Sequence, residues 1–234
     1  MALPLLVALS LSASARVPAQ DVGGAIDMTG MGIYGMEDAV MDAARGGRKS
    51  SGSGRGAVKA APVRLTFTPS MARRKRNYAA MIAAMRAKDP ATADQFQALV
   101  TKSDVVALIG RRIAPLGFRV NHLSDAYALW AVAAFSASRG QEIPTNRTVL
   151  TAVRGQMSRA FGSLPSVAKL TDADKQRATE SLLVQAVALD AAAEKAKGHP
   201  EMVAGLRAAA RQGARASGLN VDALTLTPRG FVAK

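Results

Sequence analysis

The amino-acid sequence predicts an all-α protein, and three observations lead to this prediction. Alanine and other strong helix formers are abundant along the 234 residues. Aromatic residues are few, with one Trp, three Tyr and six Phe, so the material for building sheets is scarce. Apolar side chains recur at helical spacing over most of the chain after Pro69. We therefore expect a single compact bundle of six or seven helices.

The centre of this bundle is expected at residues 117–139, GFRVNHLSDAYALWAVAAFSASR. This stretch holds the only tryptophan, Trp130, and one of the three tyrosines, Tyr127. Its apolar residues repeat with the period of a helix, which is typical of a buried helical face. We interpret it as the core helix, with Asp125 in the positively polarised first turn and Gly140 ending the helix in a left-handed conformation.

Capping residues and prolines divide the remaining sequence into helices. The expected starts, in chain order, are Thr68-Pro69, Asp89-Pro90, Ser103 or Asp104, Asn121 or Ser124, Pro144-Thr145, Thr171 and Pro200. Asp174 follows Thr171 by three residues and resembles a capping box in which Asp replaces Glu. Residues 161–170 contain a glycine and a proline and are expected to form a loop.

Two short alternating segments bracket the helical region. Residues 63–68, VRLTFT, and residues 224–228, LTLTP, are similar in sequence. Such segments are typical of short strands, and their pairing would form a small two-stranded ribbon joining the ends of the bundle.

The chain is expected to have three parts: a signal peptide at 1–19, a flexible linker at 20–62 and a helical domain at 63–234. An apolar run of about ten residues precedes Ala13-Ser14-Ala15 and Val17-Pro18-Ala19, which favours export and cleavage after Ala15 or Ala19. The mature protein is then expected to be periplasmic or secreted. The alternative is a short apolar tail on a cytosolic protein, because the run has no Lys or Arg before it. No later segment reaches the roughly 18 apolar residues of a membrane span.

The net charge of +14 is concentrated in one window. Residues 43–88 hold twelve Lys or Arg and no acidic residue, whereas the rest of the chain has nineteen basic and seventeen acidic residues. This charge is consistent with a window that binds anions and equally with a solubilising tail and an ordinary charged face. The candidate residues are Arg45, Arg48, Lys49, Arg55, Arg73, Arg74, Lys75 and Arg76.

Candidate catalytic residues are few. His122 and Asp125 are three residues apart and can share one helix face, which suits a carboxylate orienting an imidazole, or two metal ligands. The sequence has no HExxH, GxSxG, phosphate-binding or dinucleotide-binding motif. Capping and a buried hydrogen-bond network around Asp125 are therefore favoured over catalysis, with Arg119 or Asn77 as partners of Asp125.

Metal and thiol chemistry have little support in the sequence. Cysteine is absent, which excludes disulfides and thiolate sites. Met28, Met31, Met36 and Met41 recur every three to five residues, and thioethers bind Cu(I), but no His or Cys accompanies them. A glycine-rich tail with a short helix near residues 36–44 is the favoured interpretation, and we expect no cofactor.

The motif of the core helix resembles a family of exported bacterial helical proteins of unknown function. The resemblance rests on LTFTPS before a helix with Asn77, and on GFRVNHLSDAYALW, in which the matching positions are Gly117, Asn121, Ser124, Asp125, Ala126 and Tyr127. It covers about residues 63–234 and implies a helical fold and export, without an activity. Asn121, Ser124, Asp125, Tyr127 and Trp130 are accordingly expected to form a structural motif.

These observations lead to three hypotheses. The first is an exported, non-enzymatic helical binding or structural module of the bacterial envelope, whose basic linker is attracted to anionic lipid or envelope polysaccharide. The second is an enzyme with a site around His122 and Asp125. The third is a cytosolic nucleic-acid-binding protein that uses Arg45 to Arg76, disfavoured because exposed aromatic residues for base stacking are missing.

Overall fold

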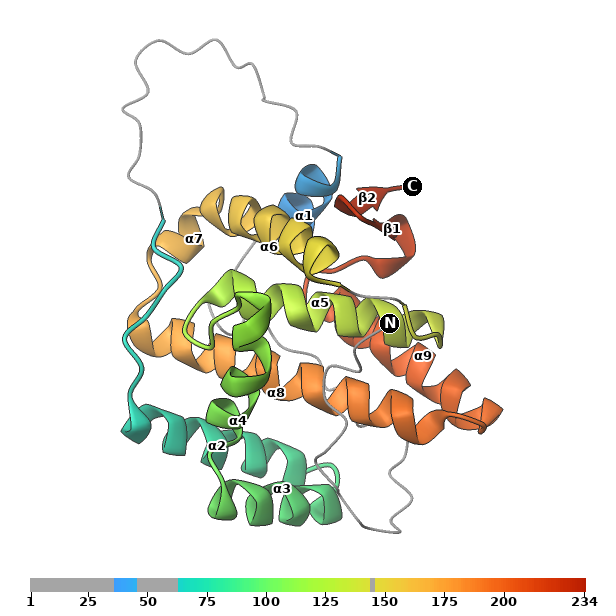
Figure 1. The fold of residues 1–234 in the computed structure, drawn as a ribbon. Helices are drawn as coiled ribbons and strands as arrows, with labels where there is room; N and C mark the ends of the chain where they lie inside the picture. The colour runs from blue at the N-terminus through green and yellow to red at the C-terminus, as the bar shows by residue number, and fades with distance from the viewer. Residues whose placement is uncertain (1–35, 46–62, 144–145) are drawn as a thin grey trace.

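The computed structural model describes residues 36–45, 63–143 and 146–234, and over these residues the protein is a compact helical bundle (Figure 1). The prediction of an all-α fold is confirmed. The α-helices are α1 (Met36–Ala44), α2 (Met71–Arg86), α3 (Pro90–Lys102), α4 (Val105–Ile113), α5 (Leu123–Arg139), α6 (Arg147–Gly162), α7 (Pro165–Ala168), α8 (Asp172–Ala196) and α9 (Pro200–Ala216). Two 3-10 turns, η1 (Ala114–Leu116) and η2 (Val221–Ala223), and two strands, β1 (Leu224–Thr227) and β2 (Gly230–Ala233), complete the described elements.

Helix α5 is the core of the bundle, as expected for residues 117–139. It contacts α6, α8 and α9, and Figure 1 shows it between α6 and α8. Every residue of α5 is buried except Ser136 and Arg139. A helix with apolar residues on all sides must be enclosed by other elements. We call the helices that enclose it, α6, α8 and α9, the apolar socket of α5.

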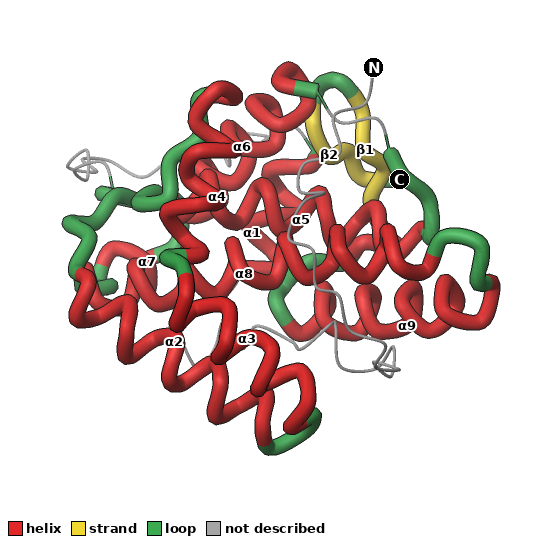
Figure 2. Tube along the Cα trace, turned by 60° about the horizontal axis from the view of Figure 1, so that its bottom comes forward, coloured by secondary structure: helices red, strands yellow, loops and turns green. Residues whose placement is uncertain are grey.

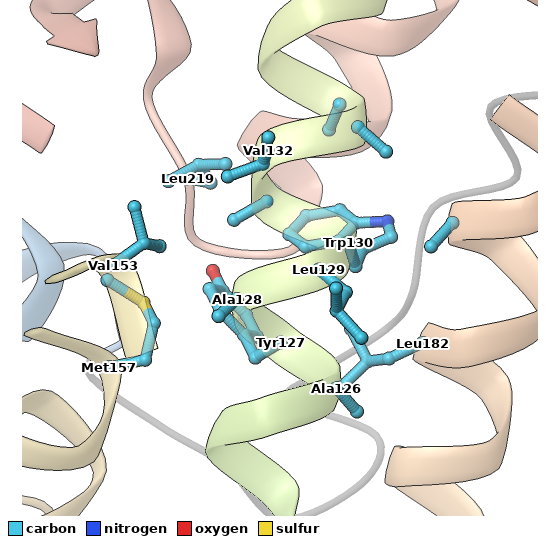
Figure 3. Packing of buried hydrophobic residues seen from close by; sticks show 14 of the residues in the cluster. Ala126, Tyr127, Ala128, Leu129, Trp130, Val132, Val153, Met157, Leu182 and Leu219 are labelled. Atoms are coloured by element: carbon cyan, nitrogen blue, oxygen red, sulfur yellow. The ribbon is translucent and has the colours of Figure 1, made fainter. Parts of the chain in front are cut away.

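Aromatic rings fill the middle of this socket (Figure 3). The centroid of the Tyr127 ring lies 5.1 Å from that of Trp130 and 5.4 Å from that of Phe161. In Figure 3, Met157 faces Tyr127 from α6, and Leu182 approaches from α8. Because six of the seventeen α5 residues are alanine, the few large side chains account for much of the apolar area buried there.

Most of the expected helix boundaries are confirmed. Asp89 and Asp104 accept hydrogen bonds from the first turns of α3 and α4, and Thr171 and Asp174 form a reciprocal capping box at α8. Helix α5 ends at Gly140, whose φ of 64° is the expected left-handed conformation.

Three expectations outside α5 differ from the structure, and in the first two another residue provides the cap. Ser70 caps α2, so Pro69 precedes the helix rather than opening it. Asn146 caps α6, which begins at Arg147; Pro144 and Thr145 lie outside the described residues. The expected loop at 161–170 includes the end of α6 and the short helix α7.

A two-stranded ribbon is present, but the strands that pair are not the two that were predicted. β1 pairs antiparallel with β2, with Leu224 opposite Ala233, and not with residues 63–68. The carboxamide of Gln156 on α6 bonds both backbone groups of Phe231, donating to its O at 2.6 Å and accepting from its N–H at 2.8 Å. Residues 63–68 instead run beside the start of α5, where Thr66 forms a single bridge with His122.

The folded part begins before residue 63. Helix α1 contacts α6 and β2, and its Val40, Ala43 and Ala44 are buried. The residues expected as a linker, 20–62, therefore include a packed helix at 36–44. The remainder of that segment and the predicted signal peptide at 1–19 lie outside the described residues.

The α2–α3 hairpin projects from the rest of the bundle (Figure 2). Helix α3 packs on α2, and α2 packs on α8. In the described part of the chain, no helix is long and apolar enough to cross a membrane.

Candidate functional site

The residues of the sequence motif meet at the first turn of α5. The backbone of residues 65–67 lies against residues 121–123, with hydrogen bonds from Leu123 N–H to Leu65 O at 3.0 Å and from Phe67 N–H to Asn121 O at 3.2 Å. Asn121 Nδ2 also donates to Phe67 O at 3.3 Å. Neither Asn121 nor Ser124 caps α5: His122 occupies the cap position, without a side-chain bond to the helix. Asn121 fastens the preceding segment to the helix instead.

Asp125 and His122 are in contact, as their spacing predicted. His122 Nδ1 lies 3.0 Å from Asp125 Oδ1 and 3.0 Å from Ser124 Oγ. The other oxygen of Asp125, Oδ2, accepts the Arg119 backbone N–H at 2.9 Å, and Ser124 Oγ lies 2.8 Å from Ser158 Oγ on α6. Of the two partners expected for Asp125, Arg119 is the one found, through its main chain.

This arrangement limits the chemistry of the pair. Asp125 is 1% exposed and His122 is 15% exposed. Both the carboxylate and the serine hydroxyl face the same ring nitrogen of His122, whereas a nucleophilic triad places them on opposite nitrogens. The geometry supports a hydrogen-bonded clamp that holds the chain before α5 against its first turn.

One small space of about 10 Å³ lies between α5, α8 and α9, lined by Trp130, Leu189 and Ala214 among others. It is large enough for about one water molecule. Within the described ranges, no group of three or more His, Asp or Glu side chains could hold a metal ion.

Tyr127 and Trp130, the apolar members of the motif, have structural positions. Tyr127 is fully buried, and its hydroxyl donates to Ser217 O at 3.2 Å, which ties α5 to the end of α9. Trp130 is 2% exposed and lies in the aromatic cluster of Figure 3. Both residues therefore position the core helix.

A second polar network joins α2 to α8. Arg74, expected to bind external anions, is buried, and its Nε donates to Glu180 Oε1 at 2.8 Å. Asn77 Nδ2 donates to Glu180 Oε2 at 2.6 Å, and Gln176 Nε2 donates to Glu180 Oε1 at 2.8 Å. Glu180 is completely buried. We call Arg74, Asn77, Gln176 and Glu180 the α2–α8 seam.

The seam extends to the start of α4. Arg74 also forms an ion pair with Asp104, and the Tyr78 hydroxyl donates to Asp104 at 3.1 Å. Burial alone would lower the pKa of the Arg74 guanidinium, but the carboxylates of Glu180 and Asp104 raise it above its ordinary value. Arg74 stays charged and paired inside the protein. The expectation that it binds an external anion is therefore wrong.

The other basic candidates divide into three groups. Arg48, Lys49 and Arg55 lie outside the described residues. Arg73 is half-buried and bonds Gln176 and the Thr68 carbonyl. The remaining three, Arg45, Lys75 and Arg76, are exposed and form no ion pair with any described carboxylate.

The methionines do not assemble a described copper site. Met28 and Met31 lie outside the described residues, as does the side chain of Met36. Met41 is half-buried against the core. The copper hypothesis therefore has no support among the described residues.

The fold and the clamp define a class of protein: an all-helical domain built around one enclosed central helix. The chain belongs to DUF6683, a family of unknown function whose model matches residues 35–234. The match confirms the resemblance to an uncharacterised domain family and begins at α1 rather than near Val63. No curated protein and no solved structure matches the chain.

Proposed function

We propose that this protein is an exported, non-enzymatic helical module that binds the anionic lipid surface of the bacterial envelope. The observation that carries the proposal is the outward face of α2. Lys75 and Arg76 are exposed there without an ion pair to a described carboxylate. Four basic residues of the preceding segment, Arg48, Lys49, Arg55 and Lys59, add to the charge on this part of the chain.

The apolar character of the same face supports a lipid rather than a soluble anion. Among the described residues, Met71 is the large apolar side chain that is exposed, at 54%, and it lies one turn before Lys75. Ala72, Ala79, Ala80 and Ala83 continue the exposed face. Small side chains let a helix approach a surface closely, and Met71 can insert between headgroups.

The expected strength follows from the number of cations. Each Lys or Arg close to an anionic membrane contributes about 1 kcal/mol, and the attraction falls off within about 10 Å at moderate salt. Lys75 and Arg76 together are thus worth about 2 kcal/mol, or roughly thirtyfold in affinity. Such binding is reversible and sensitive to salt.

Nucleic acid fits the described surface less well. The aromatic side chains of the described part are buried, except Phe96, which is half-buried against Tyr78. Single-stranded nucleic acid is bound through stacking on exposed rings, which this surface lacks. Export, favoured by the opening twenty residues, points in the same direction.

An enzyme is the second candidate, and the 3.0 Å contact between His122 and Asp125 is the observation in its favour. We place it second because the carboxylate of Asp125 and the hydroxyl of Ser124 both face the same ring nitrogen of His122.

The proposal can be tested by co-sedimentation of the purified protein with vesicles. Phosphatidylcholine vesicles with and without phosphatidylglycerol are compared at low and high salt. We expect binding to the anionic vesicles only, decreasing with salt, and a roughly thirtyfold loss on Lys75→Gln/Arg76→Gln. The matched control is Lys169→Gln/Arg229→Gln, which removes two exposed cations elsewhere without an ion pair to a described carboxylate.

Equal loss in both variants, or binding to duplex DNA but not to vesicles, would count against the proposal. Export is tested separately by the intact mass of the protein from the periplasmic fraction. A chain beginning at Arg16 or Gln20 supports export, and an uncleaved cytosolic chain contradicts it.

A further inference from the structure

Arginine side chains gather around Gly117, away from the basic window. Gly117 ends the 3-10 turn η1 with a φ of 81°, a left-handed conformation that favours glycine. Arg154 on α6 reaches this turn, and its Nη1 donates to Gly117 O at 2.9 Å. The Arg154 guanidinium also lies 5.1 Å from the centroid of the buried Phe118 ring. Its position is therefore fixed by a carbonyl and an aromatic face, with its charge left uncompensated.

Arg147 brings a second guanidinium group to this turn, and the exposed Arg119 lies close to it in sequence. Arg147 lies two turns before Arg154 on α6, and its Nη2 is 3.4 Å from the position that a Cβ on Gly117 would occupy. Arg119 follows Gly117 by two residues, its main chain held by the hydrogen bond to Asp125. Arg119 and Arg147 are exposed, and Arg154 is half-buried. We call Arg119, Arg147 and Arg154 the Gly117 arginine cluster.

The chain supplies no described negative charge to this cluster. Residues 105–170 contain seven arginines but only two acidic residues, Asp125 and Glu142. Asp125 is buried, with one oxygen bonded to the Arg119 N–H and the other facing His122, and Glu142 lies beside Lys197. No member of the cluster forms an ion pair with a described carboxylate. Like charges close to one another repel each other. A bound external anion would reduce this repulsion, which no described carboxylate offsets.

The geometry of the donors indicates which anion fits. Guanidinium groups bind phosphate through paired N–H donors, and a phosphate group offers several oxygens to more than one arginine at once. A single carboxylate has only two oxygens. The bond from Arg154 to the Gly117 carbonyl uses one donor of its guanidinium, and other N–H groups stay available.

We propose that the Gly117 arginine cluster is a binding site for one phosphate group, either free or on a lipid headgroup. This site goes beyond the lipid-binding face of α2, because it lies on other elements and takes a single phosphate. Arg154 provides a fixed donor, Arg147 lies beside the same turn, and the exposed Arg119, two residues after Gly117, supplies the third guanidinium group.

The test is a titration of the full chain with inorganic phosphate at constant ionic strength, followed by amide chemical shifts in NMR spectra. We expect saturable shifts at Gly117 to Arg119 and in the first turn of α6, with chloride giving none. Arg147→Gln and Arg119→Gln are each expected to weaken phosphate binding about tenfold, as for the loss of a charge-assisted hydrogen bond. These two variants remove exposed side chains and keep the Arg154 contact with the turn.

The controls separate this site from the face of α2. Lys169→Gln/Arg229→Gln and Lys75→Gln/Arg76→Gln are expected to leave phosphate affinity unchanged. A second arm uses vesicles with phosphatidylglycerol: if the physiological source is a lipid, Arg119→Gln/Arg147→Gln also reduces vesicle binding, and if it is free phosphate, vesicle binding is unaffected. Absence of saturable phosphate binding, equal weakening by the control variants, or binding of duplex DNA without binding of phosphate would each overturn the proposal.

Discussion

Helices α5 and α2 are attached to the same helix, α8, in opposite ways. Helix α5 lies against α8 through apolar side chains such as Trp130 and Leu182, in a socket closed on all sides. Helix α2 lies against α8 through the polar α2–α8 seam, with Arg74 and Glu180 at its centre. An apolar contact loses stability in proportion to the volume removed. A buried ion pair loses most when one partner is removed, because the other charge is left without water or a counter-charge.

The largest effect is expected in the apolar socket. Trp130→Ala removes a buried ring that contacts Tyr127, and we expect the free energy of unfolding to fall by about 3–5 kcal/mol. Urea unfolding followed by circular dichroism measures the change. Trp130→Phe keeps most of the volume and is expected to cost less than half as much. Equal effects of the two variants would show that volume does not determine stability there.

Removing one charge from the seam is expected to rank next. Glu180→Ala leaves the buried Arg74 with Asp104 alone and takes the acceptor from Asn77 and Gln176, for a loss of about 3 kcal/mol. The same unfolding experiment serves as the measurement. Glu194→Ala on the same helix, where the side chain is exposed, is the control and is expected to change stability by about 0.5 kcal/mol or less. If the two glutamates behave alike, the seam does not anchor α2.

Breaking a buried contact made of uncharged hydrogen bonds should cost less free energy. Gln156→Ala removes both hydrogen bonds to Phe231 and leaves a buried N–H and carbonyl unpaired, for about 2 kcal/mol. Hydrogen exchange of the β1 and β2 amides gives a local measurement, because the ribbon should open before the bundle unfolds. Uniformly faster exchange in every helix would contradict this local role.

The smallest expected effect concerns Asp190, a carboxylate of α8 that forms no ion pair with a described cation. Burial, and then the charge of Glu142, raise the pKa of Asp190 to about 7. Because the folded pKa lies above the unfolded value of about 4, this group contributes stability below pH 4 that is lost as the pH rises through 7. Asp190 is half-buried, so we expect the difference to be only about 1–2 kcal/mol.

Asp190→Asn should remove this pH dependence. When the free energy of unfolding is measured between pH 4 and 8, the value for the variant is expected to increase relative to that of the native protein as the pH rises. Asp42→Asn, at an exposed position on α1, is the control. Parallel curves for the native protein and Asp190→Asn would contradict the assignment.

The same contrast explains what the sequence could predict. The core helix, the capping box at Thr171 and the stop at Gly140 depend on residues within one or two turns, so local spacing was sufficient. The seam joins Arg74 to Glu180, which are 106 positions apart, and nothing local marks either residue as buried. Glu180 has the spacing of a solvated residue, and Arg74 is one of four consecutive cations. Likewise, the similarity of residues 63–68 to 224–228 did not outweigh the shorter loop between β1 and β2, since a tight hairpin closes at lower entropic cost.

The candidate site was predicted in part. The contact of His122 with Asp125 followed from helical spacing, and the Arg119 main chain was a named partner. The hydroxyl of Ser158 comes from another helix, and the Gly117 arginine cluster depends on α6 crossing the turn after α4. Seven arginines against two acidic residues in 105–170 was the available signal, but it was less prominent than the window at 43–88.

Helix α1 lies against β2, so the beginning of the family region and the end of the chain are neighbours (Figure 1). Proteins with adjacent ends commonly tolerate circular permutation. A short glycine-rich connection from Lys234 to residue 36, with new ends opened at the exposed turn between α2 and α3, should give a folded chain. In that permuted protein the helix at residues 36–44 would be joined directly to the β1–β2 ribbon that it contacts. The contribution of this helix to the stability of the bundle could then be measured without the first 35 residues.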